Sequence, residues 1–133
     1  MSKRFKSNQF YFPILQLPTF QDERGLLTVL DDILPFEIKR TYWIYGADGQ
    51  VRGGHRHHKT RQALIAISGV VVVHMDDGLV CDDIQLDSPS RCLLVEPKDW
   101  HTMSFGVNSV LLVISSEHYN RSDYIDERYS HHD

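Results

Sequence analysis

Three histidines stand within four positions of one short segment, VRGGHRHHKTRQ, at residues 51–62. In an extended segment side chains alternate between two faces, so His55 and His57 point to one face while Arg56 points to the other. An imidazole titrates near neutral pH, which suits it to act as a general base, a general acid or a metal ligand. The spacing therefore predicts two imidazoles that face one cavity.

Two imidazoles do not by themselves complete a catalytic metal site. Such a site usually has three protein ligands, for example three histidines or two histidines and a carboxylate. Gln62 is neutral and a weak donor, which leaves His101 in PKDWH as the remaining candidate ligand. We therefore expect no metal and no cofactor, and we assign His55 and His57 to proton transfer. The other histidines are expected to be surface residues or hydrogen-bonded bystanders: His58, His74, His118, His131 and His132.

Three arginines accompany the histidine pair. Arg40 and Tyr42 lie two residues apart on a predicted strand and share a face. Arg52 precedes the histidines, and Arg24 comes from QDERGLL nearer the N-terminus. The formal net charge is −4, so the field of the whole protein attracts neither nucleic acid nor an anionic membrane. Because a guanidinium matches phosphate oxygens well, this local cluster predicts a small anionic substrate such as a diphosphate.

Gln62, Trp100 and His101 complete the candidate substrate-binding residues. Trp100 and His101 follow a proline turn at the end of a predicted strand. An aromatic ring there can either stack on a nucleobase or pack in the core. The sequence leaves both alternatives open for Trp100.

The elements that must position these residues are short strands rich in β-branched and aromatic residues. We expect them at 37–45, 62–68, 69–75, 91–97 and 109–115. Asp77-Gly78 lies between two apolar runs and predicts a hairpin with a type I′ turn. Only the tail HYNRSDYIDERY is expected to be helical, as a short exposed helix that packs Tyr124 and Ile125 onto the barrel. The pattern indicates an all-β sandwich or small barrel.

The size and composition predict one domain. A chain of 133 residues can bury a hydrophobic core without disulfide bonds or structural metals to stabilise it. Cys81 and Cys92 are isolated and are interpreted as reduced packing residues. The N-terminus superficially resembles a signal peptide, but Pro13, Gln16 and Pro18 interrupt its apolar run and no A-x-A-like cleavage site follows. We therefore expect a soluble cytoplasmic protein.

Two levels of family resemblance follow from these motifs. The spacing G-x5-H-x-H-x4-Q-x6-G, from Gly49 to Gly69, resembles the first signature of the cupin superfamily. PFEIKRTYWIYGADGQVRGGHRHHKTRQALIAISG, DDG, EPKDWHTMSF and YNRSDYIDERY together resemble the cupin-type nucleotide-sugar 3,4-ketoisomerases, over about residues 10 to 129. The resemblance implies a single cupin jelly-roll β-barrel over 1–133. It also implies a metal-free homodimer that exchanges N-terminal strands.

The resemblance implies a reaction and roles for the site residues. The family converts dTDP-4-keto-6-deoxyglucose to a dTDP-3-keto-6-deoxyhexose, a precursor of 3-amino-3,6-dideoxy sugars on bacterial surface glycans. His55 and His57 match the catalytic pair, and Tyr42 matches a tyrosine that lines the sugar site. The arginines that match residues near the diphosphate are Arg24, Arg40 and Arg52. Two departures are Arg56 on the outer face and Trp43 in place of a second tyrosine.

Three other functions are compatible with parts of the pattern. One is a nucleotide-sugar 3,5-epimerase, although such enzymes are longer and pair a histidine with a tyrosine. Another is a metal-dependent cupin enzyme. The last is a non-catalytic module that binds a sugar nucleotide.

Overall fold

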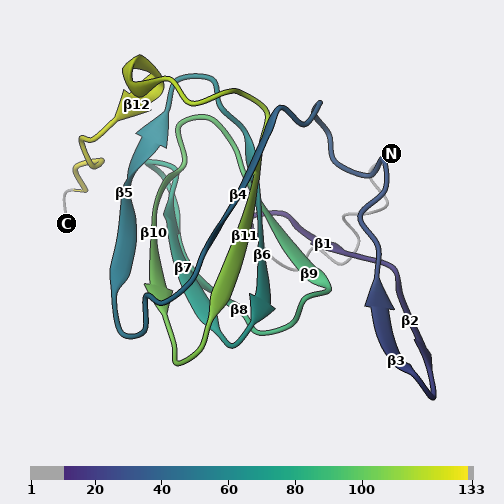
Figure 1. Cartoon of the computed structure of the whole chain (residues 1–133). Helices are drawn as coiled ribbons and strands as arrows, with labels where there is room; N and C mark the ends of the chain where they lie inside the picture. The colour runs from purple at the N-terminus through teal and green to yellow at the C-terminus, as the bar shows by residue number, and fades with distance from the viewer. Residues whose placement is uncertain (1–10, 132–133) are drawn as a thin grey trace.

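The computed structural model describes residues 11–131, and in this range the regular secondary structure is almost entirely antiparallel β-strand (Figure 1). One five-stranded sheet has the order β1 (Ile14–Gln16), β9 (Arg91–Val95), β6 (Gln62–Ser68), β11 (Val110–Ser115) and β4 (Arg40–Ile44). The other has the order β12 (Tyr124–Ile125), β5 (Val51–His57), β10 (Trp100–Phe105), β7 (Val71–Asp76) and β8 (Cys81–Leu86). Consecutive strands often lie in different sheets, as in a jelly roll. The predicted all-β jelly-roll fold is confirmed.

The core lies between the two sheets. On β7, Val71, Val73 and Met75 are fully buried, while the residues between them are only partly buried. Leu64 on β6 and Leu93 on β9 face the same core from the opposite sheet. A second apolar cluster includes Ala63, Ile65, Cys92 and Leu94, with Leu30, Ile33, Leu34 and Phe36 packed against it. Strands β6 and β9 are therefore buried on both faces, which makes them a firm support for polar residues at their ends.

Strands β5 and β10 approach each other closely at Gly53. This glycine has φ 89°, and a Cβ atom there would lie 2.9 Å from the carbonyl oxygen of His101. His101 pairs with His55, and the register shifts between His101 and Thr102. A shift of this kind is a β-bulge, which re-aims the neighbouring side chains. The glycine and the bulge together bring two histidines from different strands next to each other.

The predicted hairpin at Asp77-Gly78 exists, but the predicted type I′ turn is wrong. Strand β7 ends at Asp76 and β8 begins at Cys81, so four residues connect them. Gly78 has φ 95°, whereas Asp77 has no positive φ, and a type I′ turn needs both. The side chain of Asp77 instead accepts hydrogen bonds from the backbone N–H groups of Leu79 and Val80. This carboxylate stabilises the longer loop.

The prediction of a C-terminal helix is wrong except for one short 3-10 turn. A 3-10 helix, η2, spans Arg121–Asp123, and the next two residues form β12, which pairs with β5. The side chain of Asp123 accepts hydrogen bonds from the backbone N–H groups of Lys59 and Thr60. These bonds fix the tail beside the edge of β5, whose free backbone groups then pair with β12. The prediction that Tyr124 packs onto the barrel is correct.

The two cysteines differ in their surroundings. Both are free, as expected, and Cys92 is buried in the core. Cys81 is exposed at the start of β8, so its interpretation as a packing residue is wrong. Within residues 11–131 no helix has the length and apolar character to cross a membrane.

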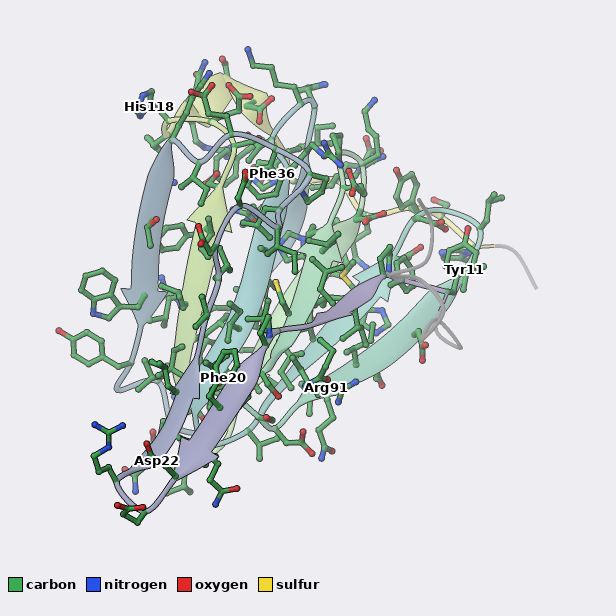
Figure 2. The ribbon with its side chains drawn as sticks, turned by 90° about the vertical axis from the view of Figure 1, so that its right-hand side faces the viewer. Tyr11, Phe20, Asp22, Phe36, Arg91 and His118 are labelled. Carbon is green, nitrogen blue, oxygen red and sulfur yellow. The ribbon has the colours of Figure 1, made fainter. Side chains whose placement is uncertain are left out.

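Strands β2 (Thr19–Asp22) and β3 (Gly25–Thr28) form a hairpin that projects from the barrel (Figures 1 and 2). Its apolar side chains are largely exposed, with 60% of Phe20, 70% of Leu26 and 62% of Leu27 accessible to solvent. Strand β1, just before it, pairs with β9 of the same chain. In contrast to β1, the β2–β3 hairpin leaves these apolar side chains largely uncovered within the protomer.

Candidate active site

A cavity of about 190 Å³ opens between the two sheets at the end where β5, β10 and β12 meet. Its polar lining comes from five strands and its floor from aliphatic and thioether side chains. The polar residues are Arg40, Tyr42, Arg52, His55, Gln62, His101 and Tyr124, and the apolar ones include Ile44, Leu64, Met103 and Val113. A small polar cavity with an apolar floor can hold a sugar-sized ligand.

The two histidines of the HxH motif lie on the same side of β5, as predicted. Their ring centroids are 5.1 Å apart, and the ring planes are nearly perpendicular. His101 is a third neighbour, with its ring 5.2 Å from that of His55. His55 lines the main cavity, whereas His57 lies deeper, beside a smaller adjoining void, and is only 2% exposed.

Burial favours the neutral form of all three imidazoles. It lowers the pKa of His55, and burial together with the nearby His55 lowers the pKa of His57 to about 4. Burial lowers the pKa of His101 to about 3, despite the backbone carbonyl oxygen of Asp99 at 3.1 Å from its Nδ1. A neutral imidazole can accept a proton, so the site holds three potential bases at neutral pH.

The Nδ1 atom of His57 is buried and has no hydrogen-bond partner among residues 11–131. A buried polar atom of this kind is costly for the fold and therefore points to function. It can bond a ligand or a substrate hydroxyl without first giving up a protein partner. His57 is therefore a candidate base next to His55.

The predicted residues from β4, β5 and β6 also meet at the cavity. The guanidinium of Arg40 lies 4.4 Å from the centre of the Tyr42 ring. The amide Nε2 of Gln62 is 3.5 Å from the hydroxyl of Tyr42, and burial raises the pKa of this tyrosine. Tyr42 therefore stays protonated and can donate a hydrogen bond to an oxygen in the cavity. Arg40 and Arg52 add positive charge to the same lining.

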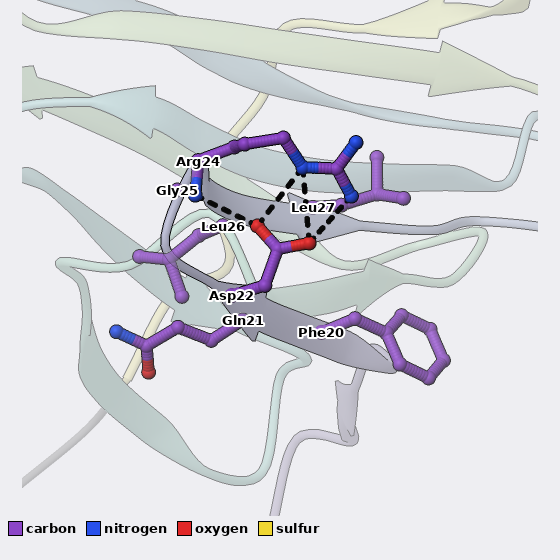
Figure 3. A pocket seen from close by; sticks show the side chains of 7 residues that line it. All are labelled: Phe20, Gln21, Asp22, Arg24, Gly25, Leu26 and Leu27. Carbon is purple, nitrogen blue, oxygen red and sulfur yellow. Dashed lines mark hydrogen bonds and ion pairs between the residues drawn. The ribbon is translucent and has the colours of Figure 1, made fainter.

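Arg24 is not brought to the cavity of its own chain. It lies at the tip of the β2–β3 hairpin, where its guanidinium forms an ion pair with Asp22 (Figure 3). Its side chain is 86% exposed. Within one protomer Arg24 therefore does not reach the cavity, and its predicted contact with the substrate would need a second chain.

Trp100 does not line the cavity either. Because β10 alternates, His101 points inward and Trp100 points to the outer face. There the indole packs 6.3 Å from the His74 ring and 4.6 Å from the guanidinium of Arg128. Of the two alternatives for Trp100, the structure favours packing. Trp43, the second departure from the family pattern, is 60% exposed on β4 and also lies outside the cavity lining.

Tyr124 is the site residue that sequence reasoning missed. Its ring lies 4.6 Å from that of His55 and 4.7 Å from that of His57. The prediction of a helical tail assigns Tyr124 only to packing on the barrel. The DYI motif of the family resemblance was the one signal that could have identified it.

The cavity histidines do not form a ready metal site. Among residues 11–131, only Asp76, Cys81 and His131 place three metal-binding atoms within 4.8 Å of one another. The three imidazoles of the cavity do not converge to that extent. Their geometry suits proton transfer, although the expected absence of a metal stays a prediction.

Comparisons with known proteins agree with this geometry. A curated TDP-4-oxo-6-deoxy-alpha-D-glucose-3,4-oxoisomerase from Aneurinibacillus thermoaerophilus is 40% identical over 108 residues, which cover 78% of each chain. A mutant of the 3,4-ketoisomerase QdtA from Thermoanaerobacterium thermosaccharolyticum, solved with TDP-4-keto-6-deoxyglucose, superposes with a TM-score of 0.84 at 34% identity, covering 90% of each chain. The TDP-quinovose 3,4-ketoisomerase WlaRB from Campylobacter jejuni superposes with a TM-score of 0.83 at 35% identity, covering 88% of this chain and 93% of that one.

A 4-keto-6-deoxy sugar epimerase from Streptomyces spheroides shares the fold, with a TM-score of 0.74, but is only 17% identical. That likeness shows a common architecture alone. The family model described as FdtA, WxcM-like, C-terminal, in contrast, matches residues 11–133. Together with the 40% identical oxoisomerase, this match shows that the chain belongs to the FdtA family of WxcM-like proteins, which the sequence resemblance indicated.

Proposed function

We propose that this chain is a sugar 3,4-ketoisomerase that converts dTDP-4-keto-6-deoxyglucose to a dTDP-3-keto-6-deoxyhexose. The observation that carries the proposal is the adjacent imidazole pair: His55 lines the cavity, and His57 is buried directly behind it with its ring centroid 5.1 Å away. The relatives that are 40% and 34% identical carry this activity in their names. The alternative function, a nucleotide-sugar 3,5-epimerase, is supported only by a distant structural likeness to sugar epimerases.

The reaction moves two hydrogens of the sugar and needs no outside oxidant. The C4 carbonyl acidifies the C3 hydrogen, and one neutral imidazole of the pair removes it as a proton. The electrons then form an enediolate across C3 and C4. Return of a proton to C4, and transfer of the hydroxyl proton from O3 to O4, leave a ketone at C3. The atoms and electrons balance within the substrate.

The cavity supplies donors for the enediolate oxygen. Tyr42 is held protonated by burial, and Arg52 lines the same space. A single well-placed donor to a developing oxyanion is worth about 3 to 4 kcal/mol. His55 and His57 are close enough to titrate as a unit, so we assign the proton relay to the pair.

The reaction is tested by following loss of the C3 hydrogen to deuterium oxide in the variants His55→Asn and His57→Asn. Each single variant is expected to lose exchange by about 10² to 10⁴, the usual contribution of a general base. His58→Asn, which replaces an exposed histidine that lines neither the cavity nor the adjoining void, is the matched control and should exchange at the wild-type rate. Wild-type exchange in both site variants would remove the catalytic assignment.

We further propose a cytoplasmic homodimer in which each β2–β3 hairpin docks on the other chain. The support is the exposed apolar surface of Phe20, Leu26 and Leu27, together with the low stability of an isolated two-stranded hairpin in water. In this arrangement Arg24 at the hairpin tip reaches the diphosphate in the cavity of the partner. Arg40 and Arg52 would bind the same diphosphate from within each chain.

Mixed dimers separate this arrangement from its alternative. Arg24→Ala and His57→Asn chains are purified separately, mixed, and unfolded and refolded together. If Arg24 acts across the dimer, one cavity of each mixed dimer contains both intact residues and activity returns. If Arg24 acts in its own chain, no cavity is complete and the mixture stays inactive. The substitution Leu26→Glu is expected to yield monomers by light scattering, whereas the equally exposed Val107→Glu, far along the chain, should not.

A further inference from the structure

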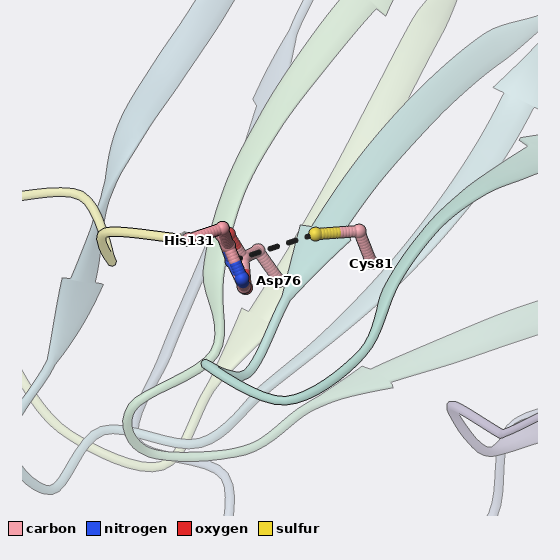
Figure 4. A group of neighbouring side chains, drawn as sticks. All are labelled: Asp76, Cys81 and His131. Carbon is pink, nitrogen blue, oxygen red and sulfur yellow. Dashed lines mark hydrogen bonds and ion pairs between the residues drawn. The ribbon is translucent and has the colours of Figure 1, made fainter. Parts of the chain in front are cut away.

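Three side chains with different metal-binding groups converge where the C-terminal tail crosses the end of the β7–β8 hairpin (Figure 4). They are Asp76 at the end of β7, Cys81 at the start of β8, and His131 in the tail. The Nε2 atom of His131 lies 2.9 and 3.0 Å from the two carboxylate oxygens of Asp76 and 3.7 Å from the Sγ atom of Cys81. None of the three residues lines the histidine cavity.

The geometry is not that of a nucleophilic triad. In a Cys–His–Asp triad the carboxylate and the nucleophile bond to opposite nitrogens of the imidazole. Here one nitrogen, Nε2 of His131, faces both the carboxylate and the sulfur. A single ring nitrogen cannot take both roles at once. Three donor atoms around one point, of oxygen, nitrogen and sulfur, are what a bound cation needs.

We propose that Asp76, Cys81 and His131 bind a divalent ion of the zinc class. Bonds of about 2.0 to 2.3 Å in a tetrahedron place neighbouring ligand atoms roughly 3.3 to 3.6 Å apart. The observed N–O and N–S separations of 2.9 and 3.7 Å approach these values, so small side-chain shifts open the site. The mixed oxygen, nitrogen and sulfur donors suit zinc better than calcium or magnesium. On binding, the thiol of Cys81 releases its proton to solvent, and water fills the fourth position.

Two of the three ligands are already held in place by the fold. The carboxylate of Asp76 is 1% exposed and accepts a hydrogen bond from the backbone N–H of Gly78. The tail is docked next to it by Tyr129, whose hydroxyl donates to the carbonyl oxygen of Lys98 at 2.7 Å. The Tyr129 ring lies 3.1 Å from where a Cβ atom of Gly78 would be. These contacts bring His131 to the hairpin without the ion.

The bound ion would attach the end of the C-terminal tail to the β7–β8 hairpin. The tail runs from Tyr124, beside His55 and His57, to His131 on the hairpin. Between them, Arg56 of β5 donates to the carbonyl oxygen of Glu127, and its guanidinium lies 3.9 Å from the centre of the Tyr129 ring. A metal at the end of this path therefore adds a cross-link between the tail and the second sheet. This role is separate from the proposed reaction.

The test is a titration of the full chain with Co²⁺, which reports sulfur ligation by a thiolate-to-metal charge-transfer absorption, and competition with Zn²⁺. One equivalent is expected to bind and to raise the melting temperature. Cys81→Ser should abolish the charge-transfer band, and His131→Ala should abolish saturable binding. His132→Ala, which removes the adjacent imidazole, is the matched control and should bind normally. A wild-type protein without the band, or a band that depends on His132 instead, would overturn the proposal.

A second measurement needs no variant. Cys81 is exposed and Cys92 is buried, so a water-soluble alkylating reagent should label Cys81 alone in the folded protein. One equivalent of Zn²⁺ is expected to protect Cys81, whereas Mg²⁺ should not. Equal labelling with and without Zn²⁺ would rule out ligation by this sulfur.

Discussion

Tyr124 lies directly opposite His57 in the pairing of β12 with β5, and their ring centroids are 4.7 Å apart. The same tyrosine ring is 4.6 Å from His55, so one side chain of the C-terminal tail contacts both imidazoles of the HxH motif. The motif alone therefore does not complete the site. The tail fixes the orientation of the pair and closes one side of the cavity.

The contribution of Tyr124 separates into its ring and its hydroxyl. We expect Tyr124→Ala to lower kcat/KM by about 100-fold, because loss of the ring lets the imidazoles of His55 and His57 move. Tyr124→Phe keeps the ring and should lose less than about tenfold. Steady-state kinetics on the 4-keto sugar measure both, with Tyr45→Ala, an exposed tyrosine outside the cavity lining, as control. Equal losses in the Ala and Phe variants would assign the role to the hydroxyl.

Asp123 anchors the segment that carries Tyr124. Its carboxylate accepts hydrogen bonds from the backbone N–H groups of Lys59 and Thr60 and from the Thr60 hydroxyl. Asp123→Ala leaves these donors without their partner, and we expect a loss of about 1 to 3 kcal/mol in the free energy of unfolding. The activity should fall with it.

Urea denaturation measures the loss in the Asp123 variant. Asp126→Ala is the control, because Asp126 is an exposed partner of Arg121 and such surface ion pairs contribute little. Equal stability of the Asp123 and Asp126 variants would mean that the tail is held by other contacts.

The sequence predicted most of what lies on regular strands. The alternation of β5 places His55 and His57 together, and the spacing of Arg40 and Tyr42 places both in the cavity lining. Alternation also decides that Trp100 points away when His101 points inward, but this needs the face of β10 to be known. That face depends on packing between the sheets, which spacing along the chain does not reveal.

The predictions that were wrong concern segments whose conformation depends on residues far away in the sequence. The tail has a helix-like charge pattern, but the open edge of β5 and the N–H groups bonded to Asp123 draw it into a strand. Cys81 looks like an isolated residue until the tail brings His131 next to it. The surroundings of Arg24 depend on the proposed dimer, which is a property of two chains.

Gly53 is expected to be indispensable for the spacing between β5 and β10. Gly53→Ala would place a Cβ atom 2.9 Å from the carbonyl oxygen of His101, and so should displace His101 from His55. Gly54→Ala is a close match, because Gly54 has φ 84° against 89° for Gly53 but nothing within 4 Å of its ideal Cβ. Both variants carry the backbone strain of roughly 1 to 2 kcal/mol. The melting temperature and kcat should both fall further for Gly53→Ala than for Gly54→Ala. Equal values for the two variants would mean that β5 and β10 can move apart at Gly53 without loss of stability.

The buried histidines should make the protein sensitive to acid. The pKa of His57 is lowered to about 4 and that of His101 to about 3, against 6.5 for an unperturbed histidine. Below pH 6.5 the unfolded chain binds protons at these residues while the folded chain does not, so acid favours unfolding. The stabilising contribution is fully present above pH 6.5 and is lost as the pH falls toward 3.

Each such group changes the free energy of unfolding by up to about 1.4 kcal/mol per pH unit in this window. We therefore expect urea denaturation to show a steep loss of stability between pH 6.5 and 4. His101→Asn removes one titrating group and should make the loss shallower, although its stability at pH 7 also falls. A His101 variant with the wild-type slope would show that His101 is not held neutral in the folded protein, because it would then titrate alike in both states.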